Sequence, residues 1–255
     1  MKIASSAFGL LAMTLCLLFV GGPAVVAEQP PSFAEANAKY EAGDFKAAAG
    51  SYEAILGSGK ASPELYYNLG NAYFRLGQKG KALLAYERAL RILPRDKDIQ
   101  WNVTILKSVL TDRLEAPGEN LLVFWLRQVV ALFTVDELAA ATTALLLLFF
   151  GMVLLTFLLP ALRLLPQFIQ ALTIPVLVAV AILFVFKWWD VKDPKVVILE
   201  REVLARYGPS QRETKSFLAH EGAEAKILDE AKEWFYVVLP NRSTGWIPKK
   251  TCEVI

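Results

Sequence analysis

The sequence predicts a multi-domain membrane protein with three parts: an all-α helical repeat array, two transmembrane helices and a small all-β domain. Apolar residues make up 55% of the chain and are concentrated in uncharged runs at residues 3–27, 138–162 and 164–186. Before the second run, small and apolar residues recur at helical spacing. After the third run, short β-forming segments alternate with turn residues, which indicates a separate β domain.

The charge and cysteine content exclude several classes of function. A net charge of +2 gives no broad basic surface, so we expect no nucleic-acid partner. The two cysteines are Cys16, in the first apolar run, and Cys252, near the end. They predict neither an internal disulfide nor a metal-ligand cluster, and the sequence gives no sign of another cofactor.

Residues 1–27 have the three-part organisation of a secretory signal peptide. Lys2 precedes the apolar run from Ala7 to Val20, and small residues follow it up to Ala27. We expect cleavage after Ala27, because the sequence Gly21-Gly22-Pro23 interrupts the helix that an uncleaved anchor would need. Retention as an anchor is the alternative, and either outcome exports the segment that follows.

Residues 32–115 are expected to form helical repeats with a capping helix. Between residues 63 and 94, small and apolar positions are spaced as in a tetratricopeptide repeat, whose period is about 34 residues. The preceding segment matches the same pattern when it is shifted by that period, and a helix near residues 97–115 would shield the end of the stack. The matching positions are Tyr66, Leu69, Gly70, Tyr73, Gly77, Ala82, Tyr86, Ala89 and Pro94.

Arrays of this kind bind peptides on the concave face formed by the first helix of each repeat. One face of the helix around Asn71 combines aromatic, amide and basic side chains at helical spacing. The amide of Asn71 can hydrogen-bond a peptide backbone, and Asn37 is its equivalent in the first repeat. Alternatively, both asparagines join neighbouring helices and Trp101 packs on the following helix. The candidate groove residues are Asn37, Tyr67, Asn71, Phe74, Arg75 and Trp101.

Residues 119–133 contain the run LLVFWLRQVVALF, in which only Arg127 and Gln128 are polar and which is too short to cross a bilayer. They predict an interfacial helix with Trp125 near the lipid headgroups, and the alternative is a buried helix packed on the repeats. A solvated helix face is expected for the basic residues of the repeats, with contact to anionic headgroups as the alternative. These residues are Lys79, Lys81, Arg88, Arg91 and Arg95.

Residues 135–189 are expected to form a transmembrane helical hairpin. Each of the two uncharged runs is long enough to cross the hydrocarbon core, which is about 30 Å thick. Only Arg163 separates the runs, and Lys187-Trp188-Trp189 forms an interfacial belt at the end of the second. Two crossings return the chain to the side from which it started, and the signal peptide predicts that this is the exported side.

Residues 195–255 predict an all-β domain. The phrases V-x-x-x-x-GPS, F-x-x-HEG and GWI between Val203 and Ile247 resemble a bacterial SH3 domain. In such a small barrel, aromatic side chains can form a groove for extended peptides. Burial in the core is the alternative for strand aromatics. The candidates are Tyr207, Trp234, Tyr236 and Trp246, and the five expected strands are 196–199, 203–205, 225–228, 234–238 and 245–247.

No catalytic constellation is visible in the sequence. His220 is the only histidine. Glu221 and Glu224 lie nearby, but no second histidine, cysteine or nucleophile accompanies it, so it is expected to be a turn residue rather than a ligand or base. Neither a G-x-S-x-G motif nor a phosphate-binding glycine loop occurs. We therefore expect a protein that is not an enzyme.

The order and lengths of these segments resemble the BatE-type proteins of the bacterial aerotolerance (Bat) operon family over almost the whole mature chain. The resemblance implies a location in the bacterial inner membrane, with both soluble domains in the periplasm. It implies a protein-interaction scaffold in contact with membrane lipid, and partners among Bat-type proteins, including membrane proteins with von Willebrand A domains and a MoxR-type AAA ATPase. The alternative function is an anchored cell-wall module whose barrel binds murein peptides.

Overall fold

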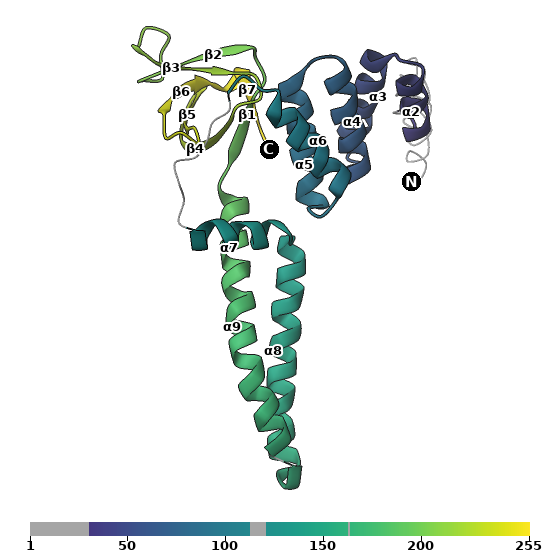
Figure 1. Cartoon of the computed structure of the whole chain (residues 1–255), viewed down its shortest axis with the longest axis vertical. Helices are drawn as coiled ribbons and strands as arrows, with labels where there is room; N and C mark the ends of the chain where they lie inside the picture. Colours follow the sequence, from purple (N-terminus) through teal and green to yellow (C-terminus); the bar gives the residue numbers. More distant parts are fainter. Residues whose placement is uncertain (1–30, 113–120, 163) are drawn as a thin grey trace, which may run out of the picture. The chain divides into compact units, whose positions relative to one another are not determined.

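The computed structural model describes residues 31–112, 121–162 and 164–255, and every structural statement below refers to these residues (Figure 1). The expected signal peptide, and Arg163 between the two apolar runs, lie outside the described residues. Within them, the chain has a helical N-terminal region, two long apolar helices and an antiparallel β domain.

The N-terminal region consists of helices whose ends are set by local sequence signals. Ser32 and Glu35 form a capping box, and the side chains of Asp44, Ser62 and Asp96 cap three further helices. The turns within the two repeats contain Gly43 and Gly77, both with positive φ. The helices are α2 (Phe33–Glu41), α3 (Phe45–Gly57), α4 (Pro63–Arg75), α5 (Lys79–Ile92) and α6 (Lys97–Ser108).

The core of this region alternates small residues with tyrosine rings. Ala36, Ala48 and Ala82 are fully buried, and Tyr86 is almost so. A Cβ atom on Gly70 would lie 2.5 Å from the ring of Tyr86, so only glycine allows α4 and α5 to approach this closely.

Two helices are long and apolar enough to cross a membrane: α8 (Val135–Leu158) and α9 (Leu164–Lys192). Thr134 and Glu137 form a capping box that starts α8. The two helices pack along each other, and the amide of Gln170 donates a hydrogen bond to Thr156 Oγ1 at 3.3 Å. Most of their apolar side chains, such as Phe157 at 77%, are exposed in the isolated chain, as expected of surfaces that contact lipid.

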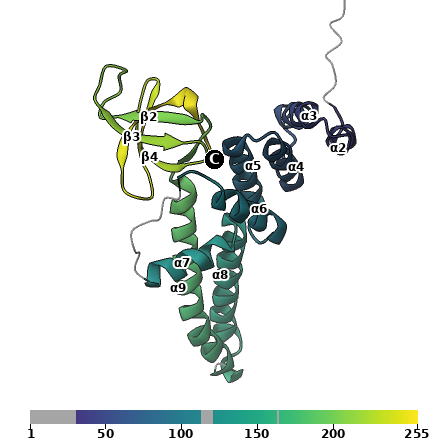
Figure 2. The same cartoon turned by 45° about the horizontal axis from the view of Figure 1, so that its top comes forward.

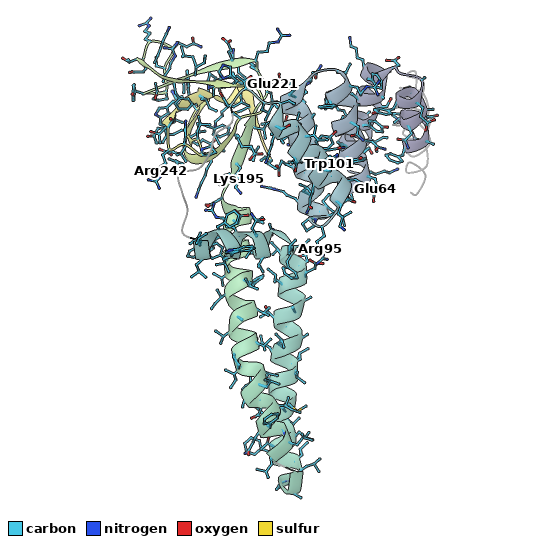
Figure 3. The ribbon with its side chains drawn as sticks, viewed as in Figure 1. Glu64, Arg95, Trp101, Lys195, Glu221 and Arg242 are labelled. Atoms are coloured by element: carbon cyan, nitrogen blue, oxygen red, sulfur yellow. The ribbon has the colours of Figure 1, made fainter. Side chains whose placement is uncertain are left out.

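Helix α7 (Leu121–Ala131) contacts α9. Val130 is its buried residue, whereas Leu122 and Trp125 are mostly exposed, so α7 is not a buried helix. The guanidinium group of Arg95, labelled in Figure 3, pairs with Glu137 and lies 5.8 Å from the centre of the Phe133 ring. The loop after α5 is thereby joined to the start of α8.

The β domain is one antiparallel sheet with the strand order β3-β2-β6-β5-β4-β1-β7, seen from a second direction in Figure 2. Five of its strands overlap the five expected from the sequence. The structure adds β3 and β7, which the sequence analysis missed because β3 is only partly buried and β7 is very short. The strands are β1 (Lys195–Ile198), β2 (Glu202–Arg206), β3 (Lys215–His220), β4 (Glu224–Ala231), β5 (Trp234–Val238), β6 (Thr244–Pro248) and β7 (Cys252–Val254).

Strand β1 is buried on both faces. Val196 and Ile198 belong to the core of the β domain, whereas Val197 belongs to the core of the repeats. This division follows from the alternation of side chains along a strand. Leu199 and Ile255 also pack against the repeat core. The β domain therefore covers the end of the helical stack, a role that the sequence analysis assigned to the capping helix alone.

Polar contacts surround this apolar seam. The backbone N–H of Gly80 donates to Glu221 Oε1 at 2.9 Å (Figure 3). Arg88 donates to Glu253 Oε1 and to the carbonyl of Val254, both at 2.7 Å. Lys79 donates to the carbonyl of Val109 at 3.0 Å. On the basic face that was expected to be solvated, Lys79, Arg88 and Arg95 thus also join separate elements through exposed polar contacts.

Lys107 bridges two carboxylates at the same seam. Its Nζ lies 2.8 Å from Oε1 of Glu87 and 2.8 Å from Oε1 of Glu224. Burial alone would lower the pKa of Lys107, but the two carboxylates outweigh it and raise that pKa. The pKa of the Glu224 carboxyl is raised, first by burial and then by the charge of Glu87.

The contact at Gly80 predicts the effect of adding one methyl group. A Cβ atom at this position would lie 2.5 Å from the carbonyl oxygen of Ile198, where backbone must move to accommodate it. We expect Gly80→Ala to lower the free energy of unfolding by about 1–3 kcal/mol. Urea unfolding in mild detergent measures this change.

Gly50→Ala is the matched control, because Gly50 also lies within a helix and a Cβ atom there would meet nothing within 4 Å. That substitution should raise the free energy of unfolding by up to about 1 kcal/mol through helix propensity. Equal stability of Gly80→Ala and the wild type would contradict the close contact.

The raised pKa of Glu224 predicts a pH dependence. The folded state holds this proton more tightly than the unfolded state, so the free energy of unfolding falls as the pH rises from the ordinary value of 4.5 through the raised pKa. Glu224→Gln removes the buried charge. We expect this variant to be at least as stable as the wild type at pH 7. Its free energy of unfolding should also depend less on pH between 4.5 and the raised pKa of Glu224.

Urea unfolding at a series of pH values measures the profile. Glu233→Gln, at an exposed position of the same domain, is the control and should leave the slope unchanged. An unchanged slope in Glu224→Gln would show that another group causes the pH dependence.

Candidate functional site

The first helix of each repeat, together with α6, contributes to a small pocket of about 120 Å³. Phe74 and Arg75 lie at its exposed rim, and the guanidinium of Arg75 stacks 4.3 Å from the centre of the Phe45 ring. This stacking holds a positive charge beside an apolar surface. The pocket is lined by Tyr40, Asn71, Phe74, Arg75, Tyr86, Asn102 and Ile105.

The base of the pocket is an asparagine–tyrosine network. Asn71 Oδ1 accepts hydrogen bonds from the hydroxyl of Tyr86 at 2.7 Å and from Nδ2 of Asn102 at 3.1 Å. Burial raises the pKa of Tyr86, which keeps its hydroxyl protonated as a donor. The amide oxygen of Asn71 is therefore used twice within the protein.

The same network occurs one repeat earlier. Asn37 Oδ1 accepts from the hydroxyl of Tyr52 at 2.6 Å and from Nδ2 of Asn68 at 3.1 Å. The geometry supports the alternative in which Asn37 and Asn71 join neighbouring helices. Within the described residues, neither asparagine donates a hydrogen bond from its own Nδ2. These N–H groups are therefore the part of the network that can still pair with a ligand.

The other groove candidates are distributed over two surfaces. Tyr67 lines a separate depression of about 80 Å³ with Pro63 and Leu93, and its ring centre lies 6.0 Å from that of Tyr86. Trp101 on α6 is 65% exposed (Figure 3), so the alternative in which it packs on the following helix is wrong. The structure thus brings together Asn71, Phe74 and Arg75 but places Tyr67 and Trp101 outside their pocket.

Tyr40, Asn102 and Ile105 also line the pocket but were missed by the sequence analysis. Asn102 had a detectable signal, because it lies one repeat period after Asn68, as Asn71 does after Asn37. Tyr40 and Ile105 had the same signal, because Tyr40 lies one repeat period before Phe74 and Ile105 lies one repeat period after Asn71.

The aromatic residues of the β domain form one contacting pair. Tyr236 on β5 and Trp246 on β6 are directly paired across the strands, with ring centres 5.2 Å apart, and both are half-buried. Tyr207 is 68% exposed in the loop after β2. Trp234 is half-buried at the start of β5. A groove formed by all four residues stays a prediction.

His220 has a structural partner rather than a place in a catalytic cluster. Asp112, after α6, accepts the backbone N–H of His220 at 2.7 Å, and its second oxygen lies 2.7 Å from Nδ1 of the ring. His220 ends a strand and is not a turn residue as expected. In the described part of the chain, no group of three or more His, Cys, Asp or Glu side chains is placed to hold a metal ion.

A tetratricopeptide repeat family model matches residues 33–97. The match begins at the first residue of α2 and ends at the first residue of α6, so it covers both two-helix units and the helices that carry Asn37 and Asn71. None of the curated proteins that were compared matches the chain. Tetratricopeptide repeats are a protein-interaction motif, which is consistent with an interaction role for this part of the chain.

Proposed function

We propose that this protein is a membrane-anchored scaffold whose tetratricopeptide repeats hold a segment of another protein. The pocket at Phe74 and Arg75 carries the proposal. An exposed aromatic ring, a positioned guanidinium and amide N–H groups lie on one surface, and aromatic and arginine side chains dominate the energy of many protein interfaces. The motif has no chemistry of its own, and we propose a role without catalysis.

The anchoring part of the proposal rests on α8 and α9. Two consecutive helices of sufficient length and hydropathy return the chain to the side from which it came, so the repeats and the β domain share one side of the membrane. The packing of Val197 of β1 in the repeat core supports the same arrangement. The signal-peptide pattern supports the periplasmic side of a bacterial inner membrane.

The resemblance to BatE-type proteins suggests the partners. Membrane proteins with von Willebrand A domains and other Bat-type proteins are the proposed occupants of the groove, within an aerotolerance-type complex. In the alternative function, the aromatic residues of an SH3-like β domain bind murein peptides. Tyr207 supports this second possibility, because its ring is exposed in a loop.

The groove proposal predicts loss of partner binding when its exposed apolar surface is removed. Phe74→Ala combined with Ile105→Ala, two exposed apolar residues of the pocket, should lower partner recovery from native membranes at least tenfold, because such anchor side chains often contribute 2 kcal/mol or more each. Affinity purification of the full chain in mild detergent, followed by protein identification and a murein assay, measures recovery. Asn71→Ala is unsuitable, because it also removes the acceptor of Tyr86.

Ile92→Ala is the matched control, since Ile92 is 45% exposed on α5 and does not line the pocket. Equal recovery of partners by the groove variant and this control would refute the proposal. Recovery of murein alone, lost in Tyr207→Ala, would favour the wall-binding alternative.

The proposed topology predicts from which side of the membrane a reagent can label introduced cysteines. Lys46→Cys in the repeats and Arg212→Cys in the β domain should both react with a membrane-impermeant maleimide in intact spheroplasts, because both side chains are exposed. The native Cys252 contributes little background, since burial raises its pKa to about 12 and leaves little reactive thiolate.

The wild-type chain is the control, because any label that it takes up comes from sites other than the two introduced cysteines. Reaction of either variant only after lysis would place that domain in the cytoplasm and contradict the proposed topology.

A further inference from the structure

A cavity of about 590 Å³ lies where α5, α7, the end of α9 and the start of β1 meet. Its volume is in the range of about 300–1,000 Å³ that is usual for small-ligand pockets. Phe186, Lys187 and Trp189 line it from α9, one of the helices that can cross a membrane. Aromatic and basic residues at the end of such a helix mark the level of the lipid headgroups. The cavity therefore lies at headgroup level if α9 crosses the bilayer.

The cavity wall contains four basic and three acidic side chains. The basic residues are Arg91, Arg127, Lys187 and Lys195. Each acidic residue already has a lysine partner: Glu87 pairs with Lys107 at 2.8 Å, Asp190 with Lys195 at 3.0 Å, and Asp193 with Lys226.

Two of the four basic side chains in the wall lack an ion pair with an acidic side chain of the described residues. Across residues 31–112, 121–162 and 164–255, no acidic side chain forms an ion pair with Arg91 or Lys187. Lys187 is half-buried near the carboxylate of Asp190, which already pairs with Lys195. A partly buried charge without an ion pair of its own is costly unless an anion accompanies it. The wall is thus suited to a ligand that carries negative charge.

We propose that this cavity binds the phosphate group of an anionic phospholipid, with Arg91 and Lys187 supplying the compensating charge. The proposal rests on the membrane anchoring proposed above, which brings headgroups to this level. Basic pockets beside transmembrane helices bind anionic lipid headgroups, and arginine matches the geometry of phosphate oxygens. The exposed Leu121, Leu122 and Trp125 of the neighbouring α7 offer an apolar surface for the acyl chains.

The full chain in mild detergent, titrated with short-chain phosphatidylglycerol and observed by native mass spectrometry, tests the proposal. Phosphatidylglycerol should be retained in preference to phosphatidylcholine of the same chain length. Arg91→Gln combined with Lys187→Gln should weaken its retention about tenfold or more, since each cation contributes roughly fivefold. Asp190→Asn should strengthen retention, because it removes a negative charge from the wall and releases Lys195.

Lys46→Gln combined with Lys60→Gln removes the same charge from exposed positions of the repeats and should leave retention unchanged. Equal retention by this control and the Arg91/Lys187 variant would overturn the proposal, as would equal retention of the two lipids. Inorganic phosphate that competes as well as phosphatidylglycerol would show a free-phosphate site instead, and a co-purified protein that displaces the lipid would show a protein-binding site.

The lipid-site proposal and the membrane-anchoring proposal can be refuted separately. Loss of the headgroup preference in a chain that still sediments with membranes after carbonate extraction refutes the lipid site alone. A chain that carbonate releases from membranes refutes the anchoring on which the lipid site rests.

Discussion

The double burial of β1 is the constraint on which the arrangement of the soluble parts depends. One face of this strand completes the β-domain core through Val196 and Ile198, and the other places Val197 in the repeat core. This geometry demands a glycine at position 80, where the helix backbone meets the carbonyl of Ile198. A short helical array cannot bury the face of its last repeat alone, and here a β domain that follows the membrane helices supplies the cover.

The asparagine network determines how the groove can act. Because the amide oxygens of Asn37 and Asn71 accept two hydrogen bonds each within the protein, they fix the spacing of neighbouring repeats. A groove whose base is already hydrogen-bonded loses little conformational freedom when it binds a ligand. In the proposed binding mode, recognition falls to the rim, where Phe74 and Arg75 present an aromatic ring and a positive charge.

Local signals explain why much of the fold was predictable. Capping residues such as Ser32 and Ser62 and the repeated glycines define the helices, and uncharged length defines α8 and α9. The contacts between Gly80 and Glu221 and between Lys107 and Glu224 join residues more than a hundred positions apart, and no local pattern reveals such pairs. For the same reason, spacing placed Asn71 on the correct helix face but left its partners open.

The dependence of the repeats on β1 has a consequence for the order in which the molecule is built. Chains are synthesised from the N-terminus, and helices α2 to α6 can form as soon as they emerge because their contacts are local. Their last apolar face, however, stays uncovered until residues 195–255, which follow α8 and α9, have been made. Completion of the repeat core is therefore coupled to completion of the hairpin, and a ribosome that stalls within α9 leaves a repeat array with an open, aggregation-prone end.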